Sequence, residues 1–547
     1  MGIWVIEQLE LLIIQYKFNL RKAGKVHLSK RKIRLQYSGF IIFSAQLIGI
    51  ITGLVFTLLL TRNMKVPQFG IWSNIFDYTA YFTLFSGLLP FWATRFVARG
   101  KEGTGKSSTL AQLTIALVSM AIYFPVIFVI YTFAIAPKIG TEAYLPIFLI
   151  AGLYILTFYM ISIFEAILQS IKPQALGYGF LIEEVVKVGV ALVLILGFRQ
   201  LFLGAVLALV LSCFVQIGYY VWLLADEFKQ KTNWSYLKEW LKGSTAIAYQ
   251  AIGSQLMAFV LILLFFYGGP STRAYYQAAV SFTTIIGYSI SLSTALYPKL
   301  LAKSCSSEEV GKSFRTVMMM AIPLTAITLV MSVSFLTVLN VAYGVAWPVL
   351  VTLSISTLIG LVILFYYTCL MGVEAFDAGG KISIHELVKS KIFKVFTLPY
   401  IQAAIALPLA YIVLTRLPVA GSVLAAVYVI LIVIGVQIST FSVLYWLMRH
   451  SISIPVAWVS IAKYVSAALL MAIIMLLLPT TTTLLSTIAK AIAGFAIYVV
   501  LLLIIDKEAR QLIRLIWEEI KGSVRQLTAK GNNGNASSGE NSTTTAN

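Results

Sequence analysis

Residues 66–98 read VPQFGIWSNIFDYTAYFTLFSGLLPFWATRFVA, and residues 269–302 repeat their outline as GPSTRAYYQAAVSFTTIIGYSISLSTALYPKLLA. Each stretch opens on a proline turn and aromatic residues, continues as an apolar run flecked with polar residues, and closes on a basic residue. The offset between the two covers six predicted membrane spans, an even number, so both copies cross the membrane in the same direction. We therefore expect two parallel lobes, related by an axis along the membrane normal, with a substrate site between them.

The composition of the whole chain is that of a membrane protein. Of its 547 residues 59% are hydrophobic and only 11% are charged, whereas a soluble protein carries about 25% charged residues. Apolar runs recur along nearly the whole chain, and each is long enough to cross ~30 Å of hydrocarbon. The runs predict an all-α polytopic membrane protein with about 14 transmembrane helices, in two six-helix lobes plus two C-terminal helices.

The polar segments between these runs predict the domain boundaries. The predicted parts are a basic cytoplasmic N-terminal segment with an interfacial helix (1–37), the N-lobe (38–225), a cytoplasmic inter-lobe linker (226–243), the C-lobe (244–447), two further spans (448–505), an amphipathic cytoplasmic helix (506–530) and a disordered tail (531–547).

The distribution of basic residues predicts the orientation. With the N-terminus in the cytoplasm, 32 of the 41 Lys and Arg residues fall in cytoplasmic segments and six, including Arg273, fall in outer loops. This asymmetry is what the positive-inside rule requires, and it places both termini in the cytoplasm of a protein of the cell membrane. The basic residues are scattered over short loops rather than gathered on one face, so we expect no nucleic-acid partner.

One short motif, taken by itself, would indicate a nucleotide-binding protein. Residues 100–108, GKEGTGKSS, satisfy the nucleotide-binding pattern G-x-x-x-x-G-K-[ST]. That pattern binds phosphate in a turn between a buried strand and a helix, whereas here it lies in a short loop between two predicted spans. We expect a basic Gly/Ser turn and no ATP, so that any transport would draw on an ion gradient, the membrane potential or the substrate's own gradient.

Few ionisable residues lie within the predicted spans. A charge at the centre of a membrane helix costs about 2.5–3.5 kcal/mol, so such residues usually face a cavity or a partner. Glu183, Glu184 and Lys187 share one broad face of the fifth span near mid-membrane. One lysine cannot neutralise two glutamates, so the remaining carboxylate needs a proton, a cation or a basic partner. The three residues are therefore either a structural ion pair between helices or a cavity face that binds a coupling cation.

The other charged residues of the spans have equally open roles. Asp77 lies near the outer end of the second span and Glu165 near the inner end of the fourth, and both join Glu183 and Glu184 as coupling or gating candidates. Lys463 and Lys490 can extend toward an interface. We expect no catalytic residues, no metal site and no cofactor, because the His and Cys residues are not clustered with carboxylates.

Both repeat segments resemble a known family. Residues 66–98 are similar to the second-span signature of polysaccharide exporters through Pro67, Phe69-Gly70, Gly87 and Arg95, and residues 273–300 resemble the family's eighth span through Tyr276, Ala278 and Pro298. The family is the Wzx-type oligosaccharidyl-lipid flippases of the multidrug/oligosaccharidyl-lipid/polysaccharide (MOP) exporter superfamily. The resemblance implies a twelve-helix core plus two C-terminal helices, and a polar or cationic cavity in which Arg95 and Lys187 are candidates to bind substrate phosphate.

The resemblance also implies a function. The expected activity is flipping of a polyprenyl- or dolichyl-(di)phosphate-linked oligosaccharide to the outer leaflet by alternating access, for surface polysaccharide or glycoprotein synthesis, with no enzymatic chemistry. The expected partners are that lipid-linked oligosaccharide, membrane lipids, and H⁺ or Na⁺ as a coupling ion. Two alternatives remain open: a cation-coupled small-molecule antiporter of the same superfamily, and a membrane glycosyltransferase or polymerase. The latter should have a large outer loop or an acidic loop motif, and the predicted outer loops are short.

The predicted topology is tested by a thiol placed at Ser538, after Cys213, Cys305 and Cys369 have been replaced by Ser. Since the tail is expected in the cytoplasm, this thiol should resist a membrane-impermeant reagent in intact cells and react after lysis. Labelling in intact cells would mean an odd number of spans and a different assignment of the lobes.

Overall fold

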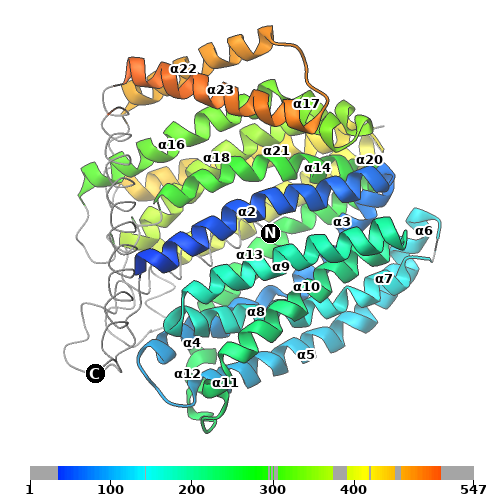
Figure 1. The fold of residues 1–547 in the computed structure, drawn as a ribbon, viewed down its shortest axis with the longest axis vertical. Helices are drawn as coiled ribbons and strands as arrows, with labels where there is room; N and C mark the ends of the chain where they lie inside the picture. Colours follow the sequence, from blue (N-terminus) through cyan, green and yellow to red (C-terminus); the bar gives the residue numbers. More distant parts are fainter. Residues whose placement is uncertain are drawn as a thin grey trace, which may run out of the picture.

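The computed structural model describes residues 35–141, 143–293, 296, 300, 306–373, 391–417, 421–449, 457–506 and 510 (Figure 1). These residues form an all-helical bundle without a strand. The predicted N-terminal interfacial helix and the disordered tail lie outside the described residues, as does the predicted amphipathic helix beyond Asp506 apart from Arg510.

The first set of helices packs together as the N-lobe. It consists of α2 (Leu35–Asn63), α3 (Val66–Phe82), η1 (Leu84–Gly87), α4 (Leu88–Ala98), α5 (Thr104–Ile130), η2 (Tyr131–Ile135), α6 (Ala136–Ile139), α7 (Leu145–Ile150), α8 (Gly152–Ile171), α9 (Gln174–Ala191), η3 (Leu192–Gly197) and α10 (Leu201–Leu223). The segment predicted as the linker is not extended, because it holds α11 (Ala225–Phe228) and α12 (Ser235–Gly243).

The second set forms the C-lobe. It consists of α13 (Thr245–Leu263), η4 (Leu264–Gly268), α14 (Pro270–Gly287), η5 (Tyr288–Ser293), α16 (Ser307–Val330), α17 (Ser332–Leu339), η6 (Val341–Ala346), α18 (Trp347–Val373), α20 (Lys391–Arg416) and α21 (Val423–Arg449). The last two helices, α22 (Trp458–Leu477) and α23 (Leu484–Ile505), pack on α16.

Helices occupy all fourteen predicted spans, although not all are equally apolar. Within the described residues, ten helices are long and apolar enough to cross a membrane. The remaining four spans are α2, α3 with η1 and α4, α9 with η3, and α14 with η5. Three of these four carry charged side chains in their interior, namely Asp77, the α9 residues Glu183, Glu184 and Lys187, and Arg273. These three charged spans therefore mark where the polar path through the bundle should be sought.

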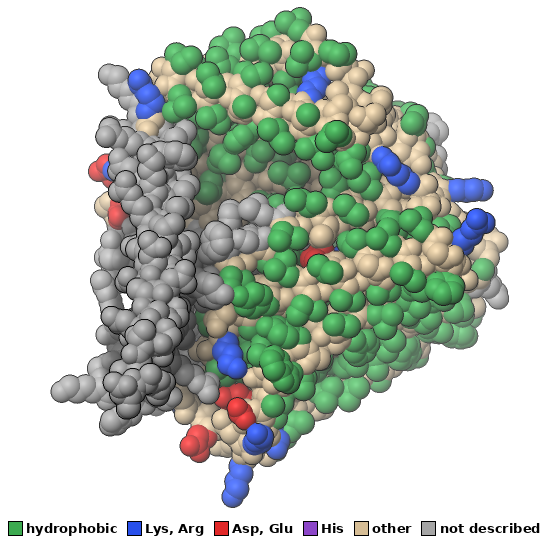
Figure 2. Space-filling view, viewed as in Figure 1, with side chains coloured by type: hydrophobic (Ala, Val, Ile, Leu, Met, Phe, Trp, Pro, Cys, Tyr) green, Lys and Arg blue, Asp and Glu red, His purple; other side chains and the backbone are tan. Residues whose placement is uncertain are grey.

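The long helices run roughly parallel across Figure 1 and define two ends of the bundle. The end with the α4–α5 turn is called the α12 end, and the end with the α2–α3 turn is called the α6 end. Hydrophobic side chains cover most of the face in Figure 2, and charged side chains gather toward its edges. This band is the pattern expected where lipid surrounds the middle of a bundle.

The two repeat segments fold alike. Both α3 and α14 begin with a proline in the first turn, at Pro67 and Pro270, where the missing N–H costs no helical hydrogen bond. Both then pass into a short 3₁₀ segment, η1 after α3 and η5 after α14. The sequence repeat is thus also a structural repeat, because in both copies a 3₁₀ segment follows the first helix.

A second pair of equivalent helices supports the same relation. In the N-lobe, α2 packs on α9 with Gly49 beneath the ring of Phe180. In the C-lobe, α13 packs on α20 with Gly253 beneath the ring of Tyr400. Each glycine leaves room for an aromatic ring that a Cβ atom would displace, since that atom would lie 2.5 Å from Phe180 or 2.6 Å from Tyr400.

The hydrophobic core shows how the lobes meet. Toward the α6 end, buried residues of both lobes form one continuous cluster, which includes Tyr131 of η2, Phe69 of α3 and Phe265 of η4. Toward the α12 end there are two separate clusters, one around Trp240 and the N-lobe helices and one around Phe365 and the C-lobe helices. Among the described residues, the lobes are therefore joined by a common core at the α6 end and have separate cores at the α12 end.

The tightest approach between the lobes is the crossing of α3 and α14. A Cβ atom on Gly70 would lie 1.8 Å from the carbonyl oxygen of Pro270, so only glycine fits there. The crossing lies at the start of both helices, and it brings the two repeat segments into direct contact.

Replacing Gly70 with Ala should force α3 and α14 apart. We expect a loss of about 1–3 kcal/mol, as for overpacking of a core, measured as a lower Tm of the detergent-solubilised protein. The matched control is Gly53→Ala on α2, where an added Cβ meets nothing within 4 Å and the Tm should stay unchanged or rise slightly. Equal effects of the two substitutions would contradict the close crossing.

Candidate transport site

The α9 cluster is defined here as Glu183, Glu184 and Lys187. Lys187 Nζ lies 2.6 Å from Glu184 Oε1 and 3.3 Å from Glu183 Oε1. The three side chains are 16%, 6% and 10% exposed, respectively. The helix turns all three to one side, as their spacing predicts, and a single ammonium group faces two carboxylates.

Thr52 of α2 distinguishes the two glutamates. Its hydroxyl donates to Glu184 Oε2 at 2.5 Å, so both oxygens of Glu184 have partners. Glu183 Oε2 has no hydrogen-bond partner among the described residues, and Glu183 is the most exposed of the cluster. Of the two carboxylates, Glu183 is therefore the one with fewer hydrogen bonds.

The α9 cluster has neighbours on both sides. Glu184 lies within electrostatic range of Tyr288, which begins η5 in the C-lobe. Glu183 lies within electrostatic range of Cys213 on α10 and of Glu165 on α8. The α9 cluster therefore has electrostatic neighbours in both lobes: Cys213 and Glu165 in the N-lobe, and Tyr288 in the C-lobe.

Glu165 belongs to a second polar group in the N-lobe. Its Oε1 accepts from the Tyr220 hydroxyl at 3.2 Å and, more weakly, from Gln216 Nε2 at 3.5 Å. Gln216 also donates to the Tyr220 hydroxyl at 3.0 Å. Tyr220 is fully buried and packs against Gly179 of α9, so this group is fixed between three helices.

Asp77 pairs across the two lobes. Arg273 Nε donates to Asp77 Oδ2 at 2.7 Å, and Nη2 donates to Oδ1 at 2.8 Å, which is a bidentate ion pair. The side chains are 3% and 10% exposed for Arg273 and Asp77. The prediction that Arg273 lies in an outer loop was wrong: α14 begins at Pro270, because the proline starts the helix earlier than hydropathy suggested, and Arg273 lies in its first turn.

A second set of contacts holds the lobes together at the same end. Arg62 Nη2 donates to the carbonyl of Val338 at 2.9 Å, and Thr61 Oγ1 donates to that of Leu339 at 3.4 Å. Asn340 Nδ2 donates back to the carbonyl of Thr61 at 3.2 Å. We call these contacts and the Asp77–Arg273 pair the latch.

The two candidates for substrate phosphate have different surroundings. Lys187 already serves two carboxylates, so a phosphate would have to displace one of them. Arg95 lies near the α12 end, with its guanidinium 4.1 Å from the ring centre of Phe91 and 5.9 Å from that of Trp92. The indole of Trp92 donates to Ser244 at the start of the C-lobe, so Arg95 lies beside a contact between the lobes.

The two remaining lysines of the spans extend to the ends of their helices. Lys490 donates to the carbonyls of Leu478 and Pro479 in the turn between α22 and α23. Lys463 Nζ lies 3.2 Å from Asp506 Oδ1, where α23 ends. Both positions agree with the expected extension toward an interface.

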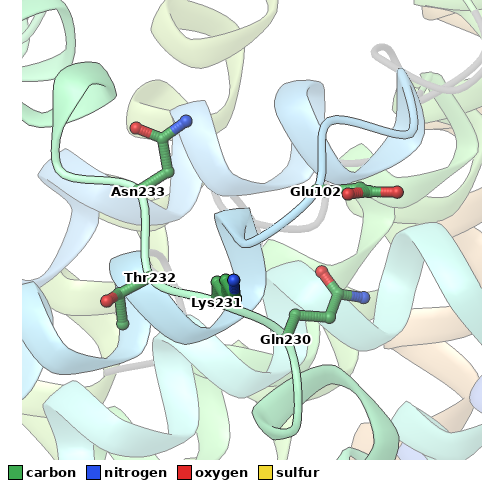
Figure 3. A pocket seen from close by; sticks show the side chains of 5 residues that line it. All are labelled: Glu102, Gln230, Lys231, Thr232 and Asn233. Carbon is green, nitrogen blue, oxygen red and sulfur yellow. The ribbon is translucent and has the colours of Figure 1, made fainter.

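The nucleotide-binding pattern lies between helices, with α4 before it and α5 after it. Gly103 N donates to Gln230 Oε1 at 2.7 Å, and Ser107 Oγ accepts from Asn233 N at 2.7 Å. The stretch therefore binds the segment between α11 and α12. A pocket of about 440 Å³ opens beside it, lined by Glu102, Gln230, Lys231, Thr232 and Asn233 (Figure 3).

Sequence analysis missed two members of the site. Thr52 lies in an apolar run and carries no signal of its own. Arg273 was visible in the repeat segment, and the proline before it could have placed it inside the helix. The structure unites Glu183, Glu184 and Lys187, brings Asp77 to Arg273, and leaves Arg95 near the α12 end.

Comparisons with known proteins agree with this architecture. Residues 37–303 match the family described as "Polysaccharide biosynthesis protein". The structure is similar to that of the lipid II flippase MurJ in an inward closed conformation (TM-score 0.61, 14% identity, covering 87% of this chain and 100% of that one). It is also similar to an inward-facing multidrug resistance MATE family transporter of the MOP superfamily (TM-score 0.54, 12% identity, 80% and 98%). No curated protein matches the sequence.

The chain is a multi-pass membrane protein whose fold is similar to that of these two transporters, one a flippase and the other a member of the MOP superfamily. Residues 37–303, which are just under half of the chain, are similar to the polysaccharide biosynthesis family. The predicted resemblance and the predicted fold class are confirmed.

The latch is tested by Asp77→Asn, which leaves Arg273 buried without a charged partner. We expect a loss of about 3–5 kcal/mol of stability and faster labelling of a thiol placed at Ala274, which is buried beside the pair. The double variant Asp77→Asn/Arg273→Gln should lose less. The control is Asp226→Asn, whose pair with Lys229 is 2.9 Å long but exposed and should contribute about 0–1 kcal/mol.

Proposed function

We propose that the protein flips a lipid-linked oligosaccharide, with a polyprenyl or dolichyl (di)phosphate carrier, from one leaflet to the other by alternating access. One observation carries the proposal: among the described residues, the lobes share a core and a buried latch at the α6 end but have separate cores at the α12 end. In our proposal the lobes separate at the α12 end, where Trp92 and Ser244 form a contact between them. The family match supports polysaccharide precursors as the substrate class.

The side that is open is the cytoplasmic one in our proposal. The α12 end carries the segments in which the sequence concentrates its Lys and Arg residues. The sugar headgroup would enter there from the cytoplasmic leaflet of the cell membrane and leave after the lobes rock apart at the α6 end. Rocking requires the bonds of Asp77 with Arg273, and of Arg62 with Val338, to break.

The lipid tail needs a path that stays in contact with the bilayer. Helix α2 packs mainly on helices of its own lobe, and it reaches the C-lobe at α17, near the α6 end. Figure 2 shows the surface hollowed between α2 and the helices α16 and α18. Ile51 of α2 is exposed directly beside Thr52. A tail could lie along this side of α2 while the headgroup occupies the polar interior.

The α9 cluster supplies a means of coupling. Lys187 and Thr52 together bond to both carboxylate oxygens of Glu184, which leaves Glu183 as the less engaged carboxylate. Glu183 would then bind and release H⁺ or Na⁺ as its access changes. Because Glu184 is near Tyr288 of the other lobe, a change of charge here alters the free energy of the two lobe arrangements differently.

A small-molecule antiporter is the second candidate. The similarity to a multidrug MATE transporter favours it, as does the oxygen of Glu183 that has no hydrogen-bond partner among the described residues. Such a protein would export drugs in exchange for a cation and would not transfer lipid-linked sugars between leaflets. Reconstitution with a labelled polyprenyl-diphosphate oligosaccharide separates the two: transfer between leaflets supports the flippase, and cation-coupled drug efflux without such transfer supports the antiporter.

The coupling role is tested by Glu183→Gln/Glu184→Gln. We expect folded, inserted protein with a slower initial flipping rate per folded molecule, because the exchangeable charge is gone. A rate equal to wild type would leave the α9 cluster as a helix-packing device.

A companion variant measures the electrostatics alone. Lys187→Ala leaves two carboxylates together without their cation, and it should destabilise the protein by about 3–5 kcal/mol. The variant in which Glu183, Glu184 and Lys187 are all neutral should be more stable than Lys187→Ala. The reverse order would show that the ion pairs themselves stabilise the N-lobe.

A further inference from the structure

The C-lobe carries a set of polar side chains that the coupling mechanism does not use. We define the amide cluster as Gln250 of α13, Gln402 of α20 and Gln437 of α21. Gln250 Nε2 donates to the Tyr367 hydroxyl at 2.6 Å, and Gln402 Nε2 donates to Thr440 Oγ1 at 2.8 Å. Three helices of one lobe thus contribute one glutamine each.

Each amide uses only half of its hydrogen-bonding capacity. Gln437 Oε1 accepts from the Ser356 hydroxyl at 3.0 Å, which leaves its NH₂ group as a donor. Gln250 and Gln402 donate through nitrogen and keep their oxygens as acceptors. Among the described residues these three remaining groups have no partner, and none is among the completely buried atoms. Exposure of free amides to hydrocarbon is unfavourable, so they should face wet space.

Aromatic rings stand beside Gln250. Tyr249 stacks on Phe393 with ring centres 5.2 Å apart, and on Tyr400 with ring centres 4.6 Å apart. The Tyr249 hydroxyl lies 3.3 Å from Thr397 Oγ1. All these side chains are partly exposed. Rings present apolar faces to ligand C–H groups, while amides and hydroxyls bond to ligand hydroxyls.

The described C-lobe helices that carry or adjoin the amide cluster have no negative charge, in contrast to α9 of the N-lobe. Within the described residues, α13, α14, α18, α20 and α21 contain no carboxylate. The residues of α20 that stand three, four and seven positions after Tyr400 are Ala403, Ala404 and Leu407. The α9 cluster stands three, four and seven positions after Phe180, which is the equivalent of Tyr400. The C-lobe repeat therefore has a neutral face on α20 where the N-lobe repeat has a charged face on α9.

We propose that the amide cluster and the Tyr249 stack form a carbohydrate subsite, which binds the uncharged sugar headgroup of the transported lipid. The inference rests on the proposed function and deepens it: the C-lobe selects the sugar, and the N-lobe handles charge. A headgroup rich in hydroxyls offers both donors and acceptors, which the two free acceptors and one free donor of the cluster require. Anionic groups such as phosphate gain little from the acceptors.

The test compares two kinds of lipid in reconstituted vesicles. One is bare polyprenyl diphosphate, and the other is the same lipid bearing glucose, galactose or N-acetylglucosamine; each carries one fluorophore near the diphosphate and is scored with an impermeant quencher. We expect the wild type to flip at least one glycosylated lipid about tenfold faster than the bare lipid, since one or two hydrogen bonds separate them. Gln250→Met and Gln437→Met should bring that ratio close to one.

The control separates binding from packing. Gln112 is a fully buried glutamine of the N-lobe that bonds to the carbonyl of Ser86, so Gln112→Met should lower the Tm and slow both lipids equally. If Gln250→Met and Gln437→Met also lower both rates equally, the amides serve packing and the subsite is refuted. A wild-type ratio of one for all three sugars refutes it as well. If the wild type flips neither kind of lipid, the proposed function itself fails.

Discussion

The crossing of α3 and α14 is the contact on which the rest of the structure depends. Gly70 admits the backbone of Pro270, and the bidentate Asp77–Arg273 pair lies beside it in a nearly dry interface. Two charges in such a place are tolerable when they are paired, or when water reaches both of them. The pair therefore stabilises the joined arrangement, because separating the two charges without water would leave both unpaired. Joining the lobes at the α6 end leaves them free to separate at the α12 end.

The two lobes share a fold but not an electrostatic role. Equivalent pairs of helices, α2 with α9 and α13 with α20, pack through a glycine beneath an aromatic ring in each lobe. On that common frame the N-lobe carries two glutamates and a lysine, whereas the equivalent face of the C-lobe is alanine and leucine, with uncharged amides nearby. Such a division suits a substrate with a charged linkage and a neutral head, because each part can be handled by a different half of the protein.

The stretch GKEGTGKSS shows how far a motif depends on its surroundings. Its glycine and serine bond to the segment between α11 and α12, so they tie the inter-lobe connection to the N-lobe. Trp240 of α12 is buried against Phe96 of α4 and strengthens the same attachment. The backbone N–H groups that a phosphate would need are here partly engaged by the protein itself.

The sequence alone determined the class of this protein, the positions of its helices and the parallel repeat. Those features follow from hydropathy and from an even number of spans, which are local properties that any fold must respect in a membrane. It also brought Glu183, Glu184 and Lys187 to one face, because helical spacing is fixed. Only the tertiary structure decided that Thr52 bonds to Glu184, that Arg273 is the partner of Asp77, and that Gln250, Gln402 and Gln437 each bond to a neighbouring helix of the C-lobe. These are contacts between residues more than thirty positions apart, so no local pattern encodes them, and they arise only when the packed lobes bring the helices together.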